Sequence, residues 1–330
     1  LVKYGDILSP APNNVFPIND YRDTFLDVVQ KDFIAQNEVY GVALYVDTLG
    51  LYYNTNMFNS AGIVTPPKDW DEFVDVSRRL TKRKTSGEIY ISGAALGAAK
   101  NVSSASDIFA LLMAQNGVIL ADEKGRINFK ASAGGTSQAE KALGFYTSFA
   151  KTSSQNYSWP KDSKLSAEEA FSQDKAAMII GYGAVGNNLL KINPRLRFSV
   201  APVPQIKNSV FHKNYPAYWG FGVYKNKSTQ NKEAAWRFLK FISQPDISSY
   251  YLSTVKKPAS RKDLVITQQS DSRLGVFATQ ALTAHSWVQL DEKAIQETFN
   301  EMIESQVSSD EVLAQTIKKA EAKLNSLMKK

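Results

Sequence analysis

The sequence predicts an α/β protein of two lobes, and three observations carry this prediction. Short apolar segments of strand type alternate along the chain with segments of helical periodicity, an order typical of α/β folds with mixed or mainly parallel sheets. The length of 330 residues exceeds the usual size of one domain. Hydrophobic residues make up 43% of the chain and charged residues 22%, as in soluble globular proteins.

In the first half of the chain, strands are predicted at 39–46 and 49–53, which are rich in valine, leucine and tyrosine. Asp69 and Glu72 are spaced as a helix-capping pair, and an apolar stripe at helical spacing follows them. Further helices are predicted at 105–115, where Asn116-Gly117 is a natural end signal, and at 137–151.

In the second half, Ser166 and Glu169 form another capping pair ahead of a short helix. Strands are predicted at 176–180, 197–203 and 218–224, and helices from about 184 to the residue before Pro194, at 229–243, at 292–305 and at 310–328.

Charge and cysteine content exclude several function classes. The net charge of +7 is spread along the chain, which favours solvated surfaces over a nucleic-acid partner. The absence of cysteine excludes disulfides, thiolate metal sites and a cysteine nucleophile. No run of about 18 apolar residues indicates a membrane span, and no signal peptide is visible.

One motif resembles a nucleotide site. Residues 181–186, Gly-Tyr-Gly-Ala-Val-Gly, form a GxGxxG between a predicted strand and a predicted helix. The acidic residue that should follow about 20 positions later is missing. The alternative is a tight strand-to-helix turn whose N–H groups can donate to an oxygen-rich ligand.

Other catalytic patterns are weak. The two histidines, His212 and His285, lack zinc-site spacing, and the chain has neither GxSxG nor a P-loop. No cofactor or metal is therefore expected. Asp47 lies between two apolar strands, where an ionised carboxylate needs hydrogen-bonding partners. It either contacts a ligand or closes a turn through its own backbone.

Aromatic residues gather in two places. Tyr45, Tyr52 and Tyr53 surround the first predicted strand pair, and Tyr215, Tyr218 and Trp219 precede a glycine-rich strand. Aromatic faces stack on sugar rings while nearby polar groups reach the hydroxyls. Trp219 and Trp287 are predicted to line a ligand site, whereas Trp70 and Trp236, on helices, are predicted to be core.

Five segments in order resemble the solute-binding proteins of bacterial ABC importers, the family that includes maltose-binding protein. These segments are LGLYYNTNMFNSAG at 49–62, PPKDWDEF at 66–73, AFSQDKAAM at 170–178, EAAWRFLKFI at 233–242 and PASR at 258–261. The resemblance extends over most of the chain.

This resemblance implies a type II periplasmic-binding-protein fold with a hinged cleft and no chemistry. The first lobe is expected at 1–43 and 225–260, the second at 50–221 and 262–330, with crossings near 44–49, 222–225 and 258–262. A mono- or oligosaccharide is the expected ligand, and a membrane ABC permease is the expected partner. The protein is expected to be a monomer outside the cytoplasmic membrane, anchored as a lipoprotein through a segment that this chain does not contain.

The resemblance also implies which residues contact the ligand. The implied residues are Asp47 at the first crossing, Asn101, Ser104 and Asp107 in a loop at a helix start, Tyr182 and Gly183 in the glycine-rich turn, and Trp219 and Trp287. Tyr45 and Tyr218 are added as expected ligand contacts from the two aromatic groups. Leu1 lines up after about the first 70–90 residues of family members, so part of the first lobe is expected to be missing. Two alternatives stay open: a nicotinamide-dependent or carboxylate-based enzyme, and a ligand-free interaction protein.

Overall fold

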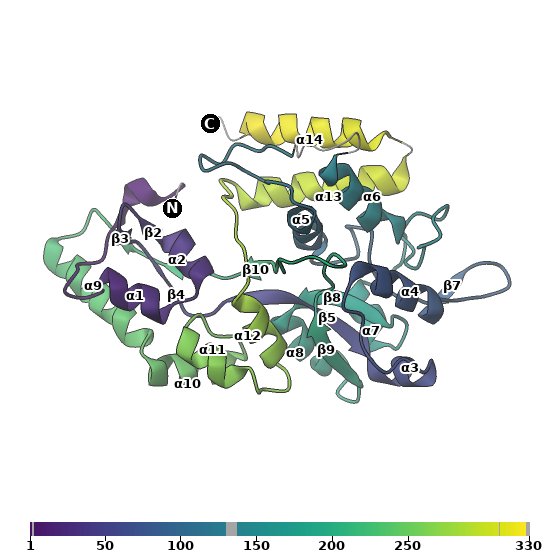
Figure 1. The fold of residues 1–330 in the computed structure, drawn as a ribbon, viewed down its shortest axis with the longest axis horizontal. Helices are drawn as coiled ribbons and strands as arrows, with labels where there is room; N and C mark the ends of the chain where they lie inside the picture. Colours follow the sequence, from purple (N-terminus) through teal and green to yellow (C-terminus); the bar gives the residue numbers. More distant parts are fainter. Residues whose placement is uncertain (2, 130–136, 310, 328–330) are drawn as a thin grey trace. The chain divides into compact units, whose positions relative to one another are not determined.

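The chain folds into two compact units, each built from separate stretches of sequence. The computed structural model describes residues 1, 3–129, 137–309 and 311–327. Unit 1 comprises residues 1–48 and 216–286, and unit 2 comprises 49–215 and 287–330. The chain therefore passes between the units three times (Figure 1).

Unit 1 carries short strands and mainly short helices. Its helical elements are η1 (Gly5–Ile7), α1 (Ile18–Thr24), α2 (Asp27–Phe33), α9 (Thr229–Ile242), α10 (Pro245–Val255), α11 (Lys262–Gln268) and α12 (Gly275–Ala281). Its strands are β1 (Leu8–Ser9), β2 (Ile34–Ala35), β3 (Glu38–Val39), β4 (Val42–Ala43), β10 (Pro216–Ala217), β11 (Gly220–Phe221) and β12 (Val223–Tyr224).

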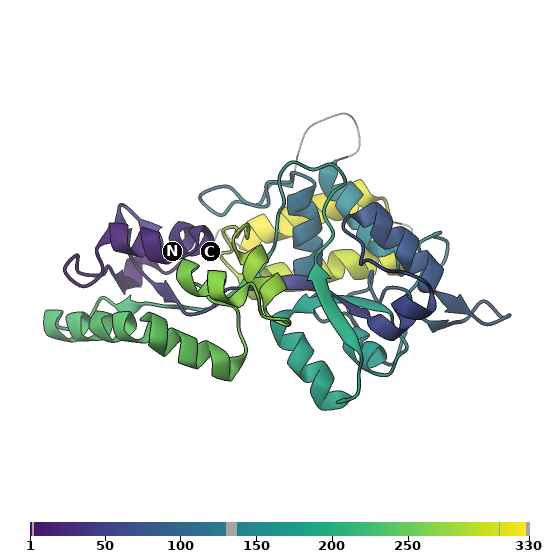
Figure 2. The ribbon, with the colours of Figure 1, turned by 60° about the horizontal axis from the view of Figure 1, so that its bottom comes forward.

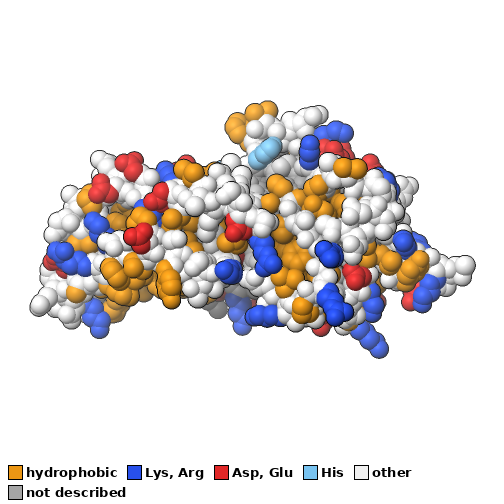
Figure 3. Space-filling model, turned by 90° about the horizontal axis from the view of Figure 1, so that it is seen from below, with side chains coloured by type: hydrophobic (Ala, Val, Ile, Leu, Met, Phe, Trp, Pro, Cys, Tyr) orange, Lys and Arg blue, Asp and Glu red, His pale blue; other side chains and the backbone are white. Residues whose placement is uncertain are grey.

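Unit 1 has a core of its own, centred on aromatic rings. Trp236 of α9 and Tyr21 and Phe25 of the α1 region are fully buried, and their rings lie around Phe16. The prediction that Trp236 is a core residue is confirmed. The helices α9 and α10 follow one another along one edge of the unit (Figure 2). Phe238 of α9 and Tyr250 of α10 are 59% and 77% exposed. Figure 3 shows hydrophobic side chains among those exposed on the surface seen from below.

Unit 2 is built around strand β5 (Asp47–Asn54), which begins in unit 1 and continues into unit 2. Its other strands are β6 (Lys82–Arg83), β7 (Ile89–Ile91), β8 (Met178–Tyr182) and β9 (Phe198–Pro202). Its helices are α3 (Thr55–Ser60), α4 (Trp70–Leu80), α5 (Ala105–Gln115), α6 (Gln138–Ser148), α7 (Ala167–Ser172), α8 (Gly183–Ile192), α13 (Glu292–Ser308) and α14 (Leu313–Leu327). The predicted ends of the last helix, Asp310 and Met328, lie outside the described residues.

The main sheet is antiparallel, so the prediction of mainly parallel sheets is wrong. Strand β5 lies between β8 and β9 and runs antiparallel to both, with Leu51 opposite Ile180 on one side and Ala201 on the other. All strand pairings among the described residues are antiparallel, and parallel contacts occur only as the isolated bridges 69–205 and 92–176. The alternation of strands and helices in the sequence does not determine the strand directions in this sheet, because its central strand β5 begins in unit 1 and lies between β8 and β9.

The helices of unit 2 confirm the capping signals in the sequence. The Asp69 carboxylate accepts from the Glu72 backbone N–H at 2.9 Å, and Ser166 and Glu169 form a complete capping box. The predicted helix at 105–115 is α5, and Gly117 follows it with a φ of 82°. Trp70 is buried as predicted. Helices α13 and α14 pack side by side and also contact α6 (Figure 1).

The unit boundaries differ from the predicted ones at two places. Residues 216–221 and 262–286 were expected in the second lobe, but they belong to unit 1. Helix α11 contacts α1 and α10, and α12 contacts α11. The Gln280 side chain of α12 also donates to the Thr48 hydroxyl at 3.3 Å. None of the helices in the described ranges is long and apolar enough to cross a membrane.

Candidate functional site

An acid–tyrosine pair in unit 2 brings two of the predicted residues together. Asp107 lies in the first turn of α5, and Tyr182 ends strand β8. The Tyr182 hydroxyl donates to Asp107 Oδ2 at 2.7 Å. Both side chains are half-buried, so the pair is partly accessible to solvent.

A second set of polar contacts surrounds Tyr215, just before the chain leaves unit 2. The Tyr215 hydroxyl accepts from the indole N–H of Trp287 at 3.2 Å and from the amide of Gln289 at 3.1 Å. The Trp287 ring stacks on Phe299 of α13, with an interplanar angle of 14°. Trp287 is half-buried and Tyr215 is 7% exposed.

The Asp107–Tyr182 pair and the contacts around Tyr215 influence each other electrostatically, as the pKa shifts of Asp107 and Tyr215 indicate. Burial raises the pKa of Asp107 to about 6, the Tyr182 hydrogen bond opposes this rise, and the Glu292 carboxylate adds to it. Burial also raises the pKa of Tyr215, and the charges of Asp107 and Glu292 act in the same direction. We call Asp107, Tyr182, Tyr215, Trp287 and Gln289 the polar–aromatic cluster.

The glycine-rich turn is held by a tyrosine from the central strand. The Tyr52 hydroxyl donates to the Tyr182 carbonyl at 2.7 Å and accepts from the Gly186 N–H at 3.1 Å. This fixes Gly183 as the first residue of α8. A dinucleotide-binding unit needs neighbouring parallel strands joined by the helix. Because β5 lies antiparallel between β8 and β9, the structure contradicts the dinucleotide interpretation.

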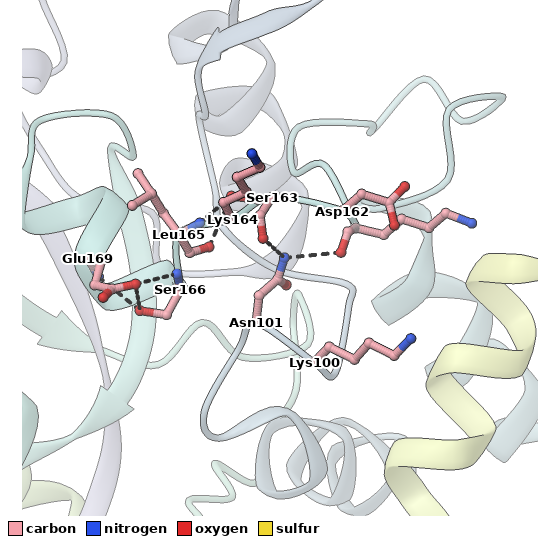
Figure 4. Close-up of a pocket in the computed structure, with 9 residues that line it drawn as sticks. Lys100, Asn101, Asp162, Ser163, Lys164, Leu165, Ser166 and Glu169 are labelled. Carbon is pink, nitrogen blue, oxygen red and sulfur yellow. Dashed lines mark hydrogen bonds between the residues drawn. The ribbon is translucent and has the colours of Figure 1, made fainter.

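Asn101 holds a loop rather than presenting a free amide. Its Nδ2 donates to the carbonyls of Pro160, Lys161 and Ser163 at 3.2–3.4 Å. Its Oδ1 accepts from the Trp159 indole at 2.7 Å. Figure 4 shows Asn101 among the residues of an open pocket of about 470 Å³.

Ser104 precedes α5 without a side-chain cap. Its carbonyl accepts from the backbone N–H of Ile108 at 2.9 Å. Ser104, like Asn101, lies close in sequence to Asp107, and the Ser104 hydroxyl makes no helix-capping hydrogen bond. A ligand contact for either residue stays a prediction.

Asp47 and Tyr45 lie together in unit 1. Asp47 is 1% exposed, and its Oδ2 lies 2.8 Å from the Lys257 ammonium. The Thr48 N–H donates to its Oδ1 at 3.0 Å. Asp47 is the first residue of β5, so the turn predicted there is absent. The same ammonium lies 5.1 Å from the centre of the Tyr45 ring, and burial raises the pKa of Tyr45.

The neighbours Tyr218 and Trp219 have opposite surroundings in unit 1. The Tyr218 hydroxyl donates to Asp32, and burial together with that carboxylate raises its pKa well above the usual value. Tyr218 therefore anchors the segment. Trp219 is 74% exposed. An exposed tryptophan next to an anchored tyrosine is suited to contact a ligand, but that role stays a prediction.

Sequence reasoning missed Gln289 and Glu292 and assigned no role to Tyr215. Tyr215 carried a signal, because it belongs to an aromatic group that the sequence already shows. Gln289 and Glu292 carried none, because their relation to Asp107 depends on how α13 packs against α5. Within the described ranges, no three histidine, aspartate or glutamate side chains are grouped as metal ligands.

This chain is similar to known solute-binding proteins. The model of the bacterial extracellular solute-binding protein family matches residues 8–247. That match covers well over half of the chain, so the chain belongs to this family, as predicted. The family consists of binding proteins located outside the cytoplasmic membrane.

Solved structures show the same two-lobe fold. A solute-binding protein from Thermotoga lettingae TMO, solved with α-D-tagatose, is 19% identical with a TM-score of 0.75, covering 99% of this chain and 82% of that one. A cyclic α-maltosyl-1,6-maltose binding protein from Arthrobacter globiformis is 17% identical with a TM-score of 0.77, covering 99% and 83%. The sugar-binding protein MalE from Xanthomonas citri is 19% identical with a TM-score of 0.76, covering 98% and 80%.

A relative from Brucella abortus (strain 2308), described as a binding protein, is 22% identical over 229 residues. The match covers 69% of this chain and 52% of the relative. The chain thus spans about half the length of the curated relatives it matches.

Proposed function

We propose that this chain is the solute-binding component of an ABC importer and that its solute is a mono- or oligosaccharide. Family membership supports the binding role. The polar–aromatic cluster carries the choice of a sugar, because it combines a half-buried indole and an amide that both bind the Tyr215 phenol with a hydrogen-bonded carboxylate–phenol pair, Asp107 and Tyr182. An indole face packs on the C–H face of a sugar ring, while carboxylate and amide groups bind its hydroxyls.

The remaining elements of the proposal follow from the family. Tyr45 and Trp219 of unit 1 are proposed as further ligand contacts, together with Gly183. Closure of the first lobe over the ligand, delivery to a membrane permease, a monomeric state and a lipid anchor are proposed on the family resemblance alone. The similar structures whose names include tagatose, maltose and cyclic oligosaccharides support the sugar class.

Isothermal titration calorimetry tests this function directly. We expect binding heat with members of a panel of neutral mono- and oligosaccharides and none with amino acids or peptides. Heat with amino acids or peptides alone would overturn the sugar assignment. Heat with none of these solutes would overturn the binding role and favour a ligand-free interaction protein.

A pair of variants locates the site. Trp287→Ala should weaken sugar affinity at least about fivefold, since stacking contributes on the order of 1 kcal/mol or more. Phe238→Ala removes an aromatic ring of unit 1 that is 59% exposed on α9, far in sequence from the cluster residues, and should leave affinity unchanged. Equal affinities for both variants would remove Trp287 from the site.

A further inference from the structure

Negative charge is concentrated beside the polar–aromatic cluster. Asp107 lies in the first turn of α5, Glu292 is the first residue of α13, and these two helices pack against each other. Both carboxylates act to raise the pKa of the same phenol, Tyr215. Glu292 also shifts Asp107 itself. Asp107 is desolvated, whereas Glu292 is exposed at the start of α13, so Asp107 exerts the stronger field on anything bound nearby.

Two lysines of the neighbouring segments bind other groups. Neither Asp107 nor Glu292 takes part in an ion pair within the described ranges. Lys213, two residues before Tyr215, donates to the Ala114 carbonyl at the far end of α5. Lys293, next to Glu292, lies 3.8 Å from Glu297. This contrasts with Asp47, whose charge Lys257 neutralises at 2.8 Å.

The groups that face Asp107 come from three other segments. The turn between β8 and α8 contributes the Tyr182 hydroxyl, the segment before β10 contributes Tyr215, and α13 contributes Glu292. An ionised carboxylate only accepts hydrogen bonds, so it suits a sugar hydroxyl or ammonium group and opposes a second anion.

We infer that Asp107 determines the charge class of the ligand, so that the site takes uncharged sugars or amino sugars and rejects sugars bearing a carboxylate, sulfate or phosphate. The inference rests on the proposed function. It adds a selection rule that follows from this chain's own side chains. Glu292 reinforces the rule from a solvated position and contributes less.

A glycan array tests this rule. The full chain, fluorescently labelled, is applied at pH 7.5 to neutral, amino-sugar and acidic glycans, the last including uronates and sulfated sugars. We expect acidic glycans to bind at least about tenfold more weakly than their neutral counterparts. Acidic glycans bound as tightly as neutral ones would overturn the inference alone. Binding to no glycan of any class would overturn the proposed function itself.

Variants and pH assign the selection to Asp107. Asp107→Asn should reduce the preference for neutral over acidic glycans about tenfold, and Glu292→Gln should reduce it less. Glu297→Gln, on the same helix, is the matched control and should leave it unchanged. Because the pKa of Asp107 is about 6, the wild-type preference should fall between pH 7.5 and pH 5. A preference that stays constant in Asp107→Asn, or in the wild type at pH 5, would overturn the assignment.

Discussion

The buried Asp47 and the half-buried Asp107 show how single residues of this protein accommodate charge. Asp47 is stabilised by the Lys257 ammonium and a backbone N–H. Asp107 has hydroxyl partners and a raised pKa instead. The first arrangement is suited to holding a strand, and the second leaves a carboxylate that can still change its partners.

Removing Lys257 should destabilise the protein. Lys257→Ala leaves the Asp47 carboxylate buried without its cation, and loss of one partner of a buried pair costs about 3 kcal/mol in the free energy of unfolding. Lys84→Ala is the control, because Lys84 and Glu88 are also 2.8 Å apart but both are exposed. It should change stability by less than about 0.5 kcal/mol. Chemical denaturation measures both, and equal effects would show that the burial of Asp47 is unimportant.

The raised pKa of Asp107 predicts a pH dependence with a definite sign. A carboxyl whose folded pKa lies above its unfolded value favours the folded state at low pH, and this contribution is lost as pH rises through about 6. Asp107→Asn removes this loss of stability at higher pH. Its stability relative to the wild type should therefore increase between pH 4 and pH 7, by up to about 3 kcal/mol.

Denaturation curves at several pH values measure this difference. Asp122 provides a contrast of opposite sign, because hydrogen bonds from Arg126 lower its pKa. Asp122→Asn should lose stability relative to the wild type as pH rises from low values. A stability difference between Asp107→Asn and the wild type that did not vary with pH would show that Asp107 is not desolvated.

At the scale of the element, the sequence predicted what is local and missed what is distant. The helices α4 and α7 were found because each N-cap side chain and its partner lie three residues apart, and α5 was found from the Asn116-Gly117 signal at its end. Helices α10, α11 and α12 were not predicted. Strand direction was wrong because the partners of β5 lie more than 100 residues away. The contacts of Asp47 with Lys257 and of Tyr215 with Trp287 could not be predicted either, because their partners lie 210 and 72 residues apart in the sequence.

The turn between β8 and α8 should depend on one hydroxyl. Tyr52→Phe leaves the Tyr182 carbonyl and the Gly186 N–H without this partner, which should cost about 1–3 kcal/mol in the free energy of unfolding. Tyr53→Phe changes the next residue of the strand, whose ring packs on Phe58, and should cost less. Thermal denaturation compares the two. A larger effect at Tyr53 would contradict the role given to Tyr52.

The pairing of β4 with β11 should depend on glycine. A Cβ at Gly220 would overlap the Phe33 ring, so Gly220→Ala should destabilise unit 1 by about 1–3 kcal/mol. Adding Phe33→Leu should restore part of this loss. Gly5→Ala is the control, because its Cβ would meet no atom within 4 Å. Denaturant titration measures all three, and no rescue by Phe33→Leu would point to backbone strain instead.

At the scale of the whole molecule, the two units have separate cores. The core around Trp236 contains side chains of unit 1, and the rings of Phe109 and Phe299 pack together in unit 2. The family and the two-lobe fold were predictable, because the matching segments occur in the family's order between residues 49 and 261. The exact boundaries were not, because residues 262–286 are assigned by packing and not by sequence pattern.

Separate cores predict separate thermal transitions. Trp236→Phe should lower the transition of unit 1, and Phe299→Leu should lower that of unit 2, each by several degrees and with little effect on the other. Differential scanning calorimetry resolves the two. A single transition that both substitutions shift equally would show that the units unfold as one.

The discontinuous sequence of unit 1 has a consequence for biosynthesis. Residues 1–48 leave the ribosome well before residues 216–286, which complete the core of unit 1. The nascent segment must wait, with Tyr21 and Phe25 unburied, while most of unit 2 is translated. Chaperones that bind unfolded chains would bind this segment during that interval. Export of the chain before it folds would take place in the same interval.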